Sequence, residues 1–133
     1  MDIKNTPHIK CVLLGDANVG KTSIINRYLK GEFCDFSEST IGCSYNNRLV
    51  ETDKYRYKLD LWDTAGQERY RGLMPMYYRN ADLIFLCVDL SQKDDKKLNN
   101  VYNYWKSQVF RHNDNDNKII ILIGTKSDCK INR

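Results

Sequence analysis

The sequence predicts an α/β domain with a mainly parallel β-sheet flanked by helices. Apolar runs at residues 9–14, 83–88 and 119–123 are typical of central strands that are covered on both faces. Segments with helical periodicity lie between these runs. The resulting order is strand, helix, two strands, helix, strand, helix, strand, which is the order of an α/β domain.

The first strand is expected at residues 9–14, where Gly15 ends the apolar run. The first helix is expected to include residues 24–29, because their apolar side chains fall on one helical stripe. Gly31 stands where the C-terminal cap of this helix would lie.

Residues 55–61 strictly alternate apolar and charged side chains, which predicts a strand with one wetter face. We expect this strand to pair with residues 45–51 in a hairpin across residues 52–54. Apolar residues at helical spacing predict a second long helix over residues 98–109. The polar run at 113–117 is interpreted as a low-complexity loop that no packed element needs.

The chain has 133 residues, which fits a single domain spanning residues 1–133. Its net charge of +4 is mild, and basic side chains alternate with acidic ones, so no nucleic-acid partner is predicted. The apolar runs are too short to span a bilayer. Five cysteines without C-x-x-C spacing indicate neither a zinc site nor a disulfide framework. No signal-peptide pattern opens the sequence, so a cytoplasmic location is expected.

A glycine-rich motif occupies residues 15–22, G-D-A-N-V-G-K-T, directly after the first strand and before the first helix. Glycines let a backbone wrap around a phosphate, and the following helix offers free N–H groups and the positive end of its dipole. We expect Lys21 to reach the terminal phosphates of a nucleotide and Thr22 to place its hydroxyl on Mg²⁺. The alternative is a glycine-rich turn that only caps a helix.

Two further motifs follow strands of the predicted sheet. In the first, W-D-T-A-G-Q, Asp63 is suited to hold the Mg²⁺ hydration shell, Gly66 to bring its N–H close to a terminal phosphate, and Gln67 to orient a water. In the second, T-K-S-D at 125–128, Asp128 can accept from two N–H donors of guanine that adenine lacks. Taken alone, either pattern is also that of a polar turn.

In this order and spacing, the three motifs resemble those of the Ras-like small GTPases. Within that superfamily the chain resembles the Rab proteins, at residues 41–45, 58–62, 69–74 and 77–81. The small residues after Gly42 and the L-M-P-M-Y-Y stretch are most similar to the early-endosomal branch. The resemblance covers about residues 8–128 and implies a P-loop NTPase fold of the Ras-like G-domain type.

The resemblance implies a switch that binds GTP and GDP with Mg²⁺, hydrolyses GTP slowly and regulates vesicle traffic. Effectors, exchange factors and activating proteins would be its partners. An activating protein is expected to supply an arginine, because no arginine in the motifs is evidently placed to act in cis. Membrane contact, on the cytosolic face of endosomes or other compartments, is expected only of a form with a lipidated C-terminus.

By position, the resemblance also assigns roles to individual residues. The phosphate cradle would consist of Gly15, Asn18, Val19, Gly20, Lys21, Thr22 and Ser23. The Mg²⁺ ligands would be Thr22, Thr40 and Asp63, with Gly66 at the terminal phosphate and Gln67 as the catalytic residue. The guanine base would be covered by Phe33 and recognised by Thr125, Lys126 and Asp128. An exposed aromatic patch for effectors would consist of Tyr45, Trp62 and Tyr77.

The chain also departs from the family pattern. Thr125 stands where most members have Asn, Tyr45 where a Phe is usual, and Ala17 where Gly or Ser is common. The family's final strand, its last two helices and its S-A-K guanine loop have no counterpart before Arg133. We therefore expect a truncated domain with residues 119–123 at the sheet edge.

Such a truncation is expected to leave part of one sheet face bare near Cys11, Leu13 and the helix at residues 24–29. It is also expected to make the chain marginally stable, prone to associate and weak in GDP binding. Two alternatives to the switch stay open. One is a truncated, non-enzymatic Rab fragment with weak nucleotide binding. The other is a P-loop kinase or ATPase, which Asp128 disfavours because it suits guanine.

Overall fold

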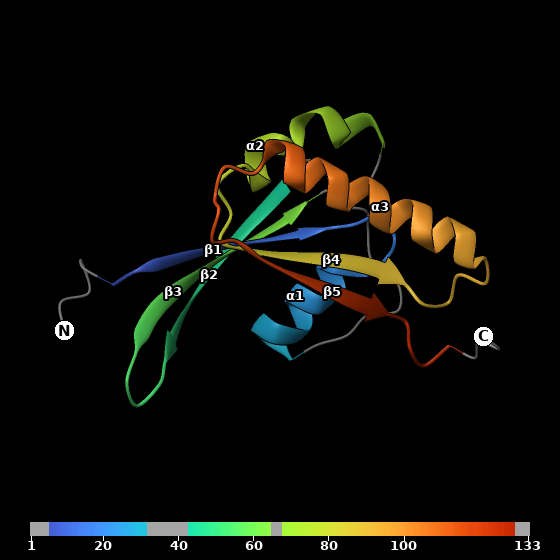
Figure 1. The fold of residues 1–133 in the computed structure, drawn as a ribbon. Helices are drawn as coiled ribbons and strands as arrows, with labels where there is room; N and C mark the ends of the chain where they lie inside the picture. Colours follow the sequence, from blue (N-terminus) through green and yellow to red (C-terminus); the bar gives the residue numbers. More distant parts are fainter. Residues whose placement is uncertain (1–5, 32–42, 65–67, 130–133) are drawn as a thin grey trace.

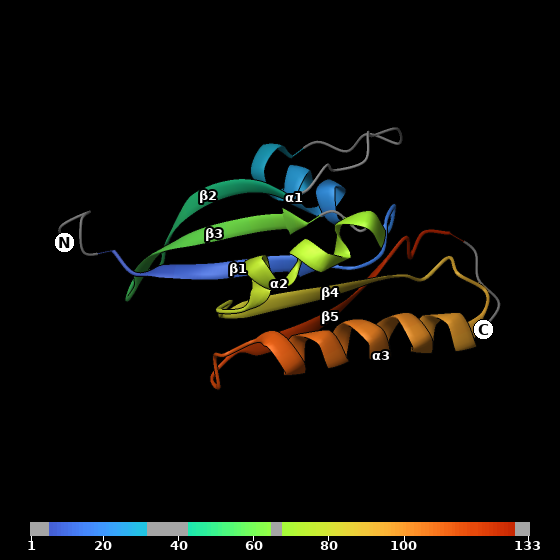
Figure 2. The same ribbon diagram turned by 90° about the horizontal axis from the view of Figure 1, so that it is seen from above.

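The computed structural model describes residues 6–31, 43–64 and 68–129 of the chain. Its centre is a five-stranded sheet in the order β2-β3-β1-β4-β5, visible strand by strand in Figure 2. The strands are β1 (His8–Leu14), β2 (Cys43–Glu51), β3 (Arg56–Thr64), β4 (Leu83–Asp89) and β5 (Ile119–Thr125). Only the β2–β3 pair is antiparallel, so the predicted mainly parallel sheet is confirmed.

Helices cover both faces of the sheet (Figure 1). One face carries α1 (Lys21–Lys30), and the other carries the 3₁₀ helix η2 (Glu68–Leu73), α2 (Pro75–Tyr78) and α3 (Asp95–His112). The predicted first and last helices are confirmed as α1 and α3. None of the helices in the described parts of the chain is long and apolar enough to cross a membrane.

The central strand β1 supplies two hydrophobic cores, because successive strand side chains point to opposite faces of a sheet. Cys11 and Leu13 pack with Ile25 of α1, whereas Val12 packs with Trp105 of α3. The expected bare apolar area lies on the α1 face at Ile119 and Ile121 of β5 and does not extend to Cys11 and Leu13. The exposed fractions of Cys11 and Leu13 are 1% and 2%, because α1 covers them.

The hairpin and the first helix closely match their predictions. The turn between β2 and β3 is closed by a hydrogen bond from the Thr52 N–H to the Tyr55 carbonyl oxygen, at 2.8 Å. Tyr55 therefore belongs to the turn, and β3 runs on to Thr64. Gly31, with φ of 70°, caps α1 by donating its N–H to the Arg27 carbonyl oxygen.

The polar loop at residues 113–117 has a structural role that its composition did not predict. The Asn113 amide donates to the Tyr78 carbonyl oxygen at 2.6 Å, and the Asn115 amide donates to the Asp82 carboxylate at 2.9 Å. These bonds satisfy polar groups where α2 joins β4. The loop thus holds the start of β4 in place.

Strand β5 forms an edge of the described sheet, as predicted. Ile119, Ile121 and Leu122 on this strand have large exposed fractions. Ile120 packs towards the α3 core and Ile123 towards the α1 core. The edge strand is therefore anchored by alternate side chains on each face.

The start of α3 provides a test of the fold. Asp94 accepts hydrogen bonds from the backbone N–H groups of Lys96 and Lys97, at 3.0 and 3.3 Å. Asp94→Ala should lower the free energy of unfolding by about 1 kcal/mol, because it leaves these donors without their cap. Urea denaturation measures the change, with the exposed Lys93→Ala as control. Equal losses in the two variants would contradict the capping role.

Candidate functional site

The three predicted motifs meet at one end of the sheet. The loop at residues 15–20 follows β1, Asp63 lies at the end of β3, and residues 126–128 follow β5. The carboxyl ends of parallel strands share one edge of a sheet, and ligands of such sheets bind there. A Cβ built on Gly20 would lie 3.8 Å from the Thr125 side chain, so the first and third motifs are neighbours.

The loop at residues 15–20 needs glycine for both conformation and space. Gly15 and Gly20 have φ of 154° and 107°, and Asn18 has φ of 64°. A Cβ on Gly15 would lie 2.5 Å from the Cys87 carbonyl oxygen at the end of β4. The loop backbone therefore touches β4 directly, and α1 begins immediately after it with its free N–H groups.

Lys21 is held within this loop by its own backbone. Its Nζ donates to the carbonyl oxygens of Gly15 and Asp16, each at 2.9 Å, and only 5% of the residue is exposed. Burial lowers the pKa of Lys21, while the nearby Asp63 carboxylate opposes this effect. The ammonium is thus held inside the loop, beside the position expected for phosphate oxygens in a loop of this kind.

Thr22 and Asp63 form a hydrogen-bonded pair of oxygen groups. The Thr22 hydroxyl donates to Asp63 Oδ2 at 2.5 Å, and Asp63 is 1% exposed. Hydroxyl and carboxylate oxygens are the ligands that Mg²⁺ prefers, so these residues fit this ion. The described residues contain no group of three His, Cys, Asp or Glu side chains that could hold a metal. Mg²⁺ in proteins usually keeps water or phosphate oxygens beside one or two protein ligands.

The third motif forms a tight turn. The Thr125 hydroxyl donates to the Val88 carbonyl oxygen at 3.0 Å, which fixes the end of β5 against β4. The Cys129 N–H donates to the Lys126 carbonyl oxygen at 3.1 Å and closes the turn. Asp128 lies within this turn and is exposed. Its carboxylate is therefore available to a ligand at this end of the sheet.

The aromatic residues Tyr45, Trp62 and Tyr77 lie in a row. The ring centroids of Tyr45 and Trp62 are 4.8 Å apart, and those of Trp62 and Tyr77 are 5.8 Å apart. Tyr45 is 45% exposed, and its hydroxyl donates to Asp60 Oδ1 at 2.6 Å. The hydroxyl that distinguishes Tyr45 from a phenylalanine thus orients the ring.

The other predicted site residues have varied positions. Of the residues predicted to form the phosphate cradle, Val19 is buried, Asn18 is exposed and Ser23, on α1, is partly buried. The remaining predicted residues lie outside the described parts of the chain: Phe33, Thr40, Gly66 and Gln67.

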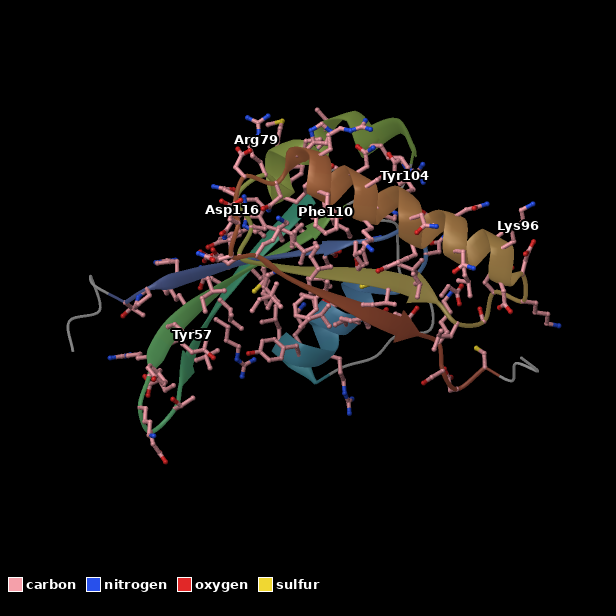
Figure 3. All side chains as sticks on the ribbon, viewed as in Figure 1. Tyr57, Arg79, Lys96, Tyr104, Phe110 and Asp116 are labelled. Carbon is pink, nitrogen blue, oxygen red and sulfur yellow. The ribbon has the colours of Figure 1, made fainter. Side chains whose placement is uncertain are left out.

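Asp16 has contacts that sequence reasoning missed. Its Oδ1 accepts from the Arg71 guanidinium of η2 at 3.0 Å and from Trp105 Nε1 of α3 at 3.1 Å. The guanidinium also lies 4.6 Å from the ring centroid of Tyr104, which α3 presents towards η2 (Figure 3). No local pattern signals these contacts, because 55 and 89 positions separate Asp16 from its two partners.

Arg71 also bears on the expectation that no arginine is placed to act in cis. It contacts the 15–20 loop through the Asp16 carboxylate, and its guanidinium also lies against the rings of Tyr104 and Trp105. The Arg71 guanidinium is therefore paired with the Asp16 side chain. The Lys21 ammonium instead contacts the carbonyl oxygens of Gly15 and Asp16.

A sequence profile described as the Ras family matches residues 10–133 of the chain. The chain belongs to the Ras family. Its relatives within this family include GTP-binding protein YPT52 of Saccharomyces cerevisiae, which is 41% identical over 128 residues, covering 90% of this chain and 53% of the relative. The Ras-related protein Rab5 of Nicotiana tabacum is 36% identical over 129 residues, covering 97% of this chain and 62% of the relative.

The Ras-related protein Rab11A of Nicotiana tabacum is 41% identical over 121 residues, covering 91% of this chain and 54% of that protein. The resemblance to Rab proteins within the Ras family, stated above from the motifs, is thereby confirmed. The chain spans between about half and three fifths of the length of these curated relatives.

A comparison of Gly15 with Gly31 separates the cost of a positive φ from the cost of a side chain at the contact with β4. Both have positive φ, but a Cβ on Gly31 would meet nothing within 4 Å, whereas a Cβ on Gly15 would meet backbone. Gly31→Ala should lower the free energy of unfolding by about 1 kcal/mol, and Gly15→Ala by at least about 2 kcal/mol. Urea denaturation of both variants measures this difference. Equal losses would show that the contact with β4 does not constrain the loop.

Proposed function

We propose that the chain is a guanine-nucleotide switch that binds GTP and GDP with Mg²⁺ and hydrolyses GTP slowly. The observation that carries this proposal is the convergence of Lys21, the Thr22–Asp63 pair and the Asp128 turn at one end of the sheet. Membership of the Ras family supports it, as does the similarity to a relative named as a GTP-binding protein.

The phosphate end of the site follows from the chain's own groups. Lys21 and the free N–H groups at the start of α1 bind phosphate oxygens. Bound at Thr22 and Asp63, Mg²⁺ would supply positive charge that offsets the charge of the phosphates. We assign Thr40 as a further ligand and Gln67 as the group that orients the attacking water, with the Gly66 N–H at the terminal phosphate.

Specificity for guanine is assigned to the turn after β5. Asp128 accepts from both N–H donors on one edge of guanine, and a site built for such donors discriminates against bases that lack them. Thr125 and Lys126 support this turn, and Phe33 covers the ring. Adenine offers no matching pair of donors, so a kinase or ATPase role is not favoured.

The row of Tyr45, Trp62 and Tyr77 is assigned as the contact surface for effector proteins. Partly exposed aromatic residues are typical of interface hot spots. Exchange factors and activating proteins are further partners. We assign the supply of an arginine to an activating protein, as in GTPases that are assisted in trans.

We further assign the chain to vesicle traffic, within the early-endosomal branch. Its place would be the cytosol and, for a lipidated form, the cytosolic face of endosomal or other intracellular membranes. The similarity to relatives named Rab5 and YPT52 supports this assignment.

The nucleotide content of the purified chain tests the proposal. The chain is expected to bind guanine nucleotide, either co-purified or added, and Lys21→Ala should lower GDP affinity at least about tenfold, because the buried ammonium is lost. Lys30→Ala, at the exposed end of the same helix, is the control and should retain GDP. Bound adenine nucleotide would instead indicate a kinase or ATPase. A chain that contains no nucleotide and binds none when it is added would indicate a non-enzymatic fragment.

The assignment of Gln67 has a separate test. Gln67→Leu should slow single-turnover GTP hydrolysis at least about tenfold while GTP affinity stays unchanged, because only the water-orienting amide is removed. Gln108→Leu on α3 controls for the loss of an amide elsewhere. If Gln67→Leu and the unaltered chain hydrolyse GTP at equal rates, Gln67 does not have this role.

A further inference from the structure

Asp89, the last residue of β4, belongs to none of the three motifs, yet it contacts one of them. Its Oδ2 lies 3.0 Å from the Lys126 ammonium, and its Oδ1 accepts from the backbone N–H and the hydroxyl of Ser91, at 2.8 and 2.5 Å. Both carboxylate oxygens are therefore engaged. One side of the carboxylate holds the β4–α3 connection and the other holds the turn after β5.

The backbone of Lys126 needs support from outside the turn. Its φ is 58°, and among the described residues Asn18 is the other non-glycine residue with positive φ. A lysine has no short side chain that could bond its own backbone to offset this conformation, as Asn and Asp have. Such a conformation persists where the surrounding structure determines it. Within the turn, the Lys126 carbonyl oxygen accepts from the Cys129 N–H, and outside the turn the Lys126 ammonium pairs with Asp89.

The residues just before Lys126 are already fixed to β4. Asp89 is directly opposite Thr125 in the parallel ladder, and the Leu90 N–H donates to the Thr125 carbonyl oxygen at 2.9 Å. A Cβ on Gly124 would lie 2.6 Å from the Leu90 side chain, so the two strand ends are in close contact. The direction of the chain after Thr125 is then set at Lys126, where the turn that carries Asp128 begins.

We propose that Asp89 is a positioning residue for base recognition, which holds Lys126 so that the turn presents Asp128 to the edge of guanine. This inference rests on the proposed function, since it requires that the turn after β5 binds a guanine base. Asp89 acts through Lys126 and does not itself contact the nucleotide.

The charge of Asp89 is consistent with this role. Partial burial alone would raise the pKa of Asp89, but hydrogen bonds from Ser91 and Lys126 outweigh burial and lower the pKa below its usual range. The carboxylate therefore stays ionised at neutral pH. The ion pair with Lys126 is maintained under the conditions in which a nucleotide would bind.

The test compares GDP with inosine diphosphate, which keeps the ring N–H of guanine but lacks its amino group. Asp89→Asn preserves the size of the side chain and an acceptor for Ser91 but removes the charge that holds Lys126. Affinities of the 1–133 chain for both nucleotides are measured with Mg²⁺ present. We expect Asp89→Asn to weaken GDP binding about tenfold and to reduce the preference for GDP over inosine diphosphate at least about threefold.

Two controls separate positioning from general loss of structure. Asp116→Asn makes the same chemical change on an exposed loop and should alter neither affinity (Figure 3). In a Lys126→Met background, Asp89→Asn should have little further effect, because the contact is already lost. Should Asp89→Asn not fold, Ser91→Ala removes a donor to the same carboxylate and should shift the nucleotide preference in the same direction.

The outcomes distinguish this inference from the proposed function. An unchanged preference in Asp89→Asn, or an undiminished effect of Asp89→Asn in the Lys126→Met background, overturns the role of Asp89 while the switch function stands. An unaltered chain that shows no preference for GDP overturns the proposed function, and the role of Asp89 with it.

Discussion

The direct contact between the 15–20 loop and the end of β4 is the constraint on which the rest of the site depends. No side chain fits between Gly15 and the Cys87 carbonyl oxygen, so the loop backbone lies on the sheet itself. This approach places the carbonyl oxygens of Gly15 and Asp16 around the Lys21 ammonium. It also sets the start of α1, from which Thr22 reaches the Asp63 carboxylate.

The position of β1 makes this contact possible. As the central strand it pairs with both β3 and β4, and its alternating side chains supply a core under α1 and another under α3. Burying both faces of one strand fixes its register against the neighbouring strands, because a shift by one residue would exchange the two cores. The loop that follows β1 is therefore positioned by hydrophobic packing on both sides of the sheet.

Polar contacts between distant segments then orient the elements around the site. Asp16 joins the 15–20 loop to η2 and α3 through Arg71 and Trp105, and Asp89 joins β4 to the turn after β5 through Lys126. In each case a carboxylate accepts from two different groups. A partly buried charge is costly unless it is paired in this way, so these contacts also specify which elements can lie side by side.

The sequence by itself determined the α/β class, the parallel strands, the hairpin and the placement of the 15–20 loop, because apolar periodicity and glycine-rich turns are local signals. It also brought Lys21, Thr22, Asp63 and Asp128 into one predicted site, since parallel strands share their carboxyl edge. The tertiary structure alone decided how Asp16, Asp89 and the 113–117 loop are used. It also decided that α1 covers Cys11 and Leu13. These contacts join residues far apart in the chain, and their partners depend on how the helices pack against the sheet, which no local pattern encodes.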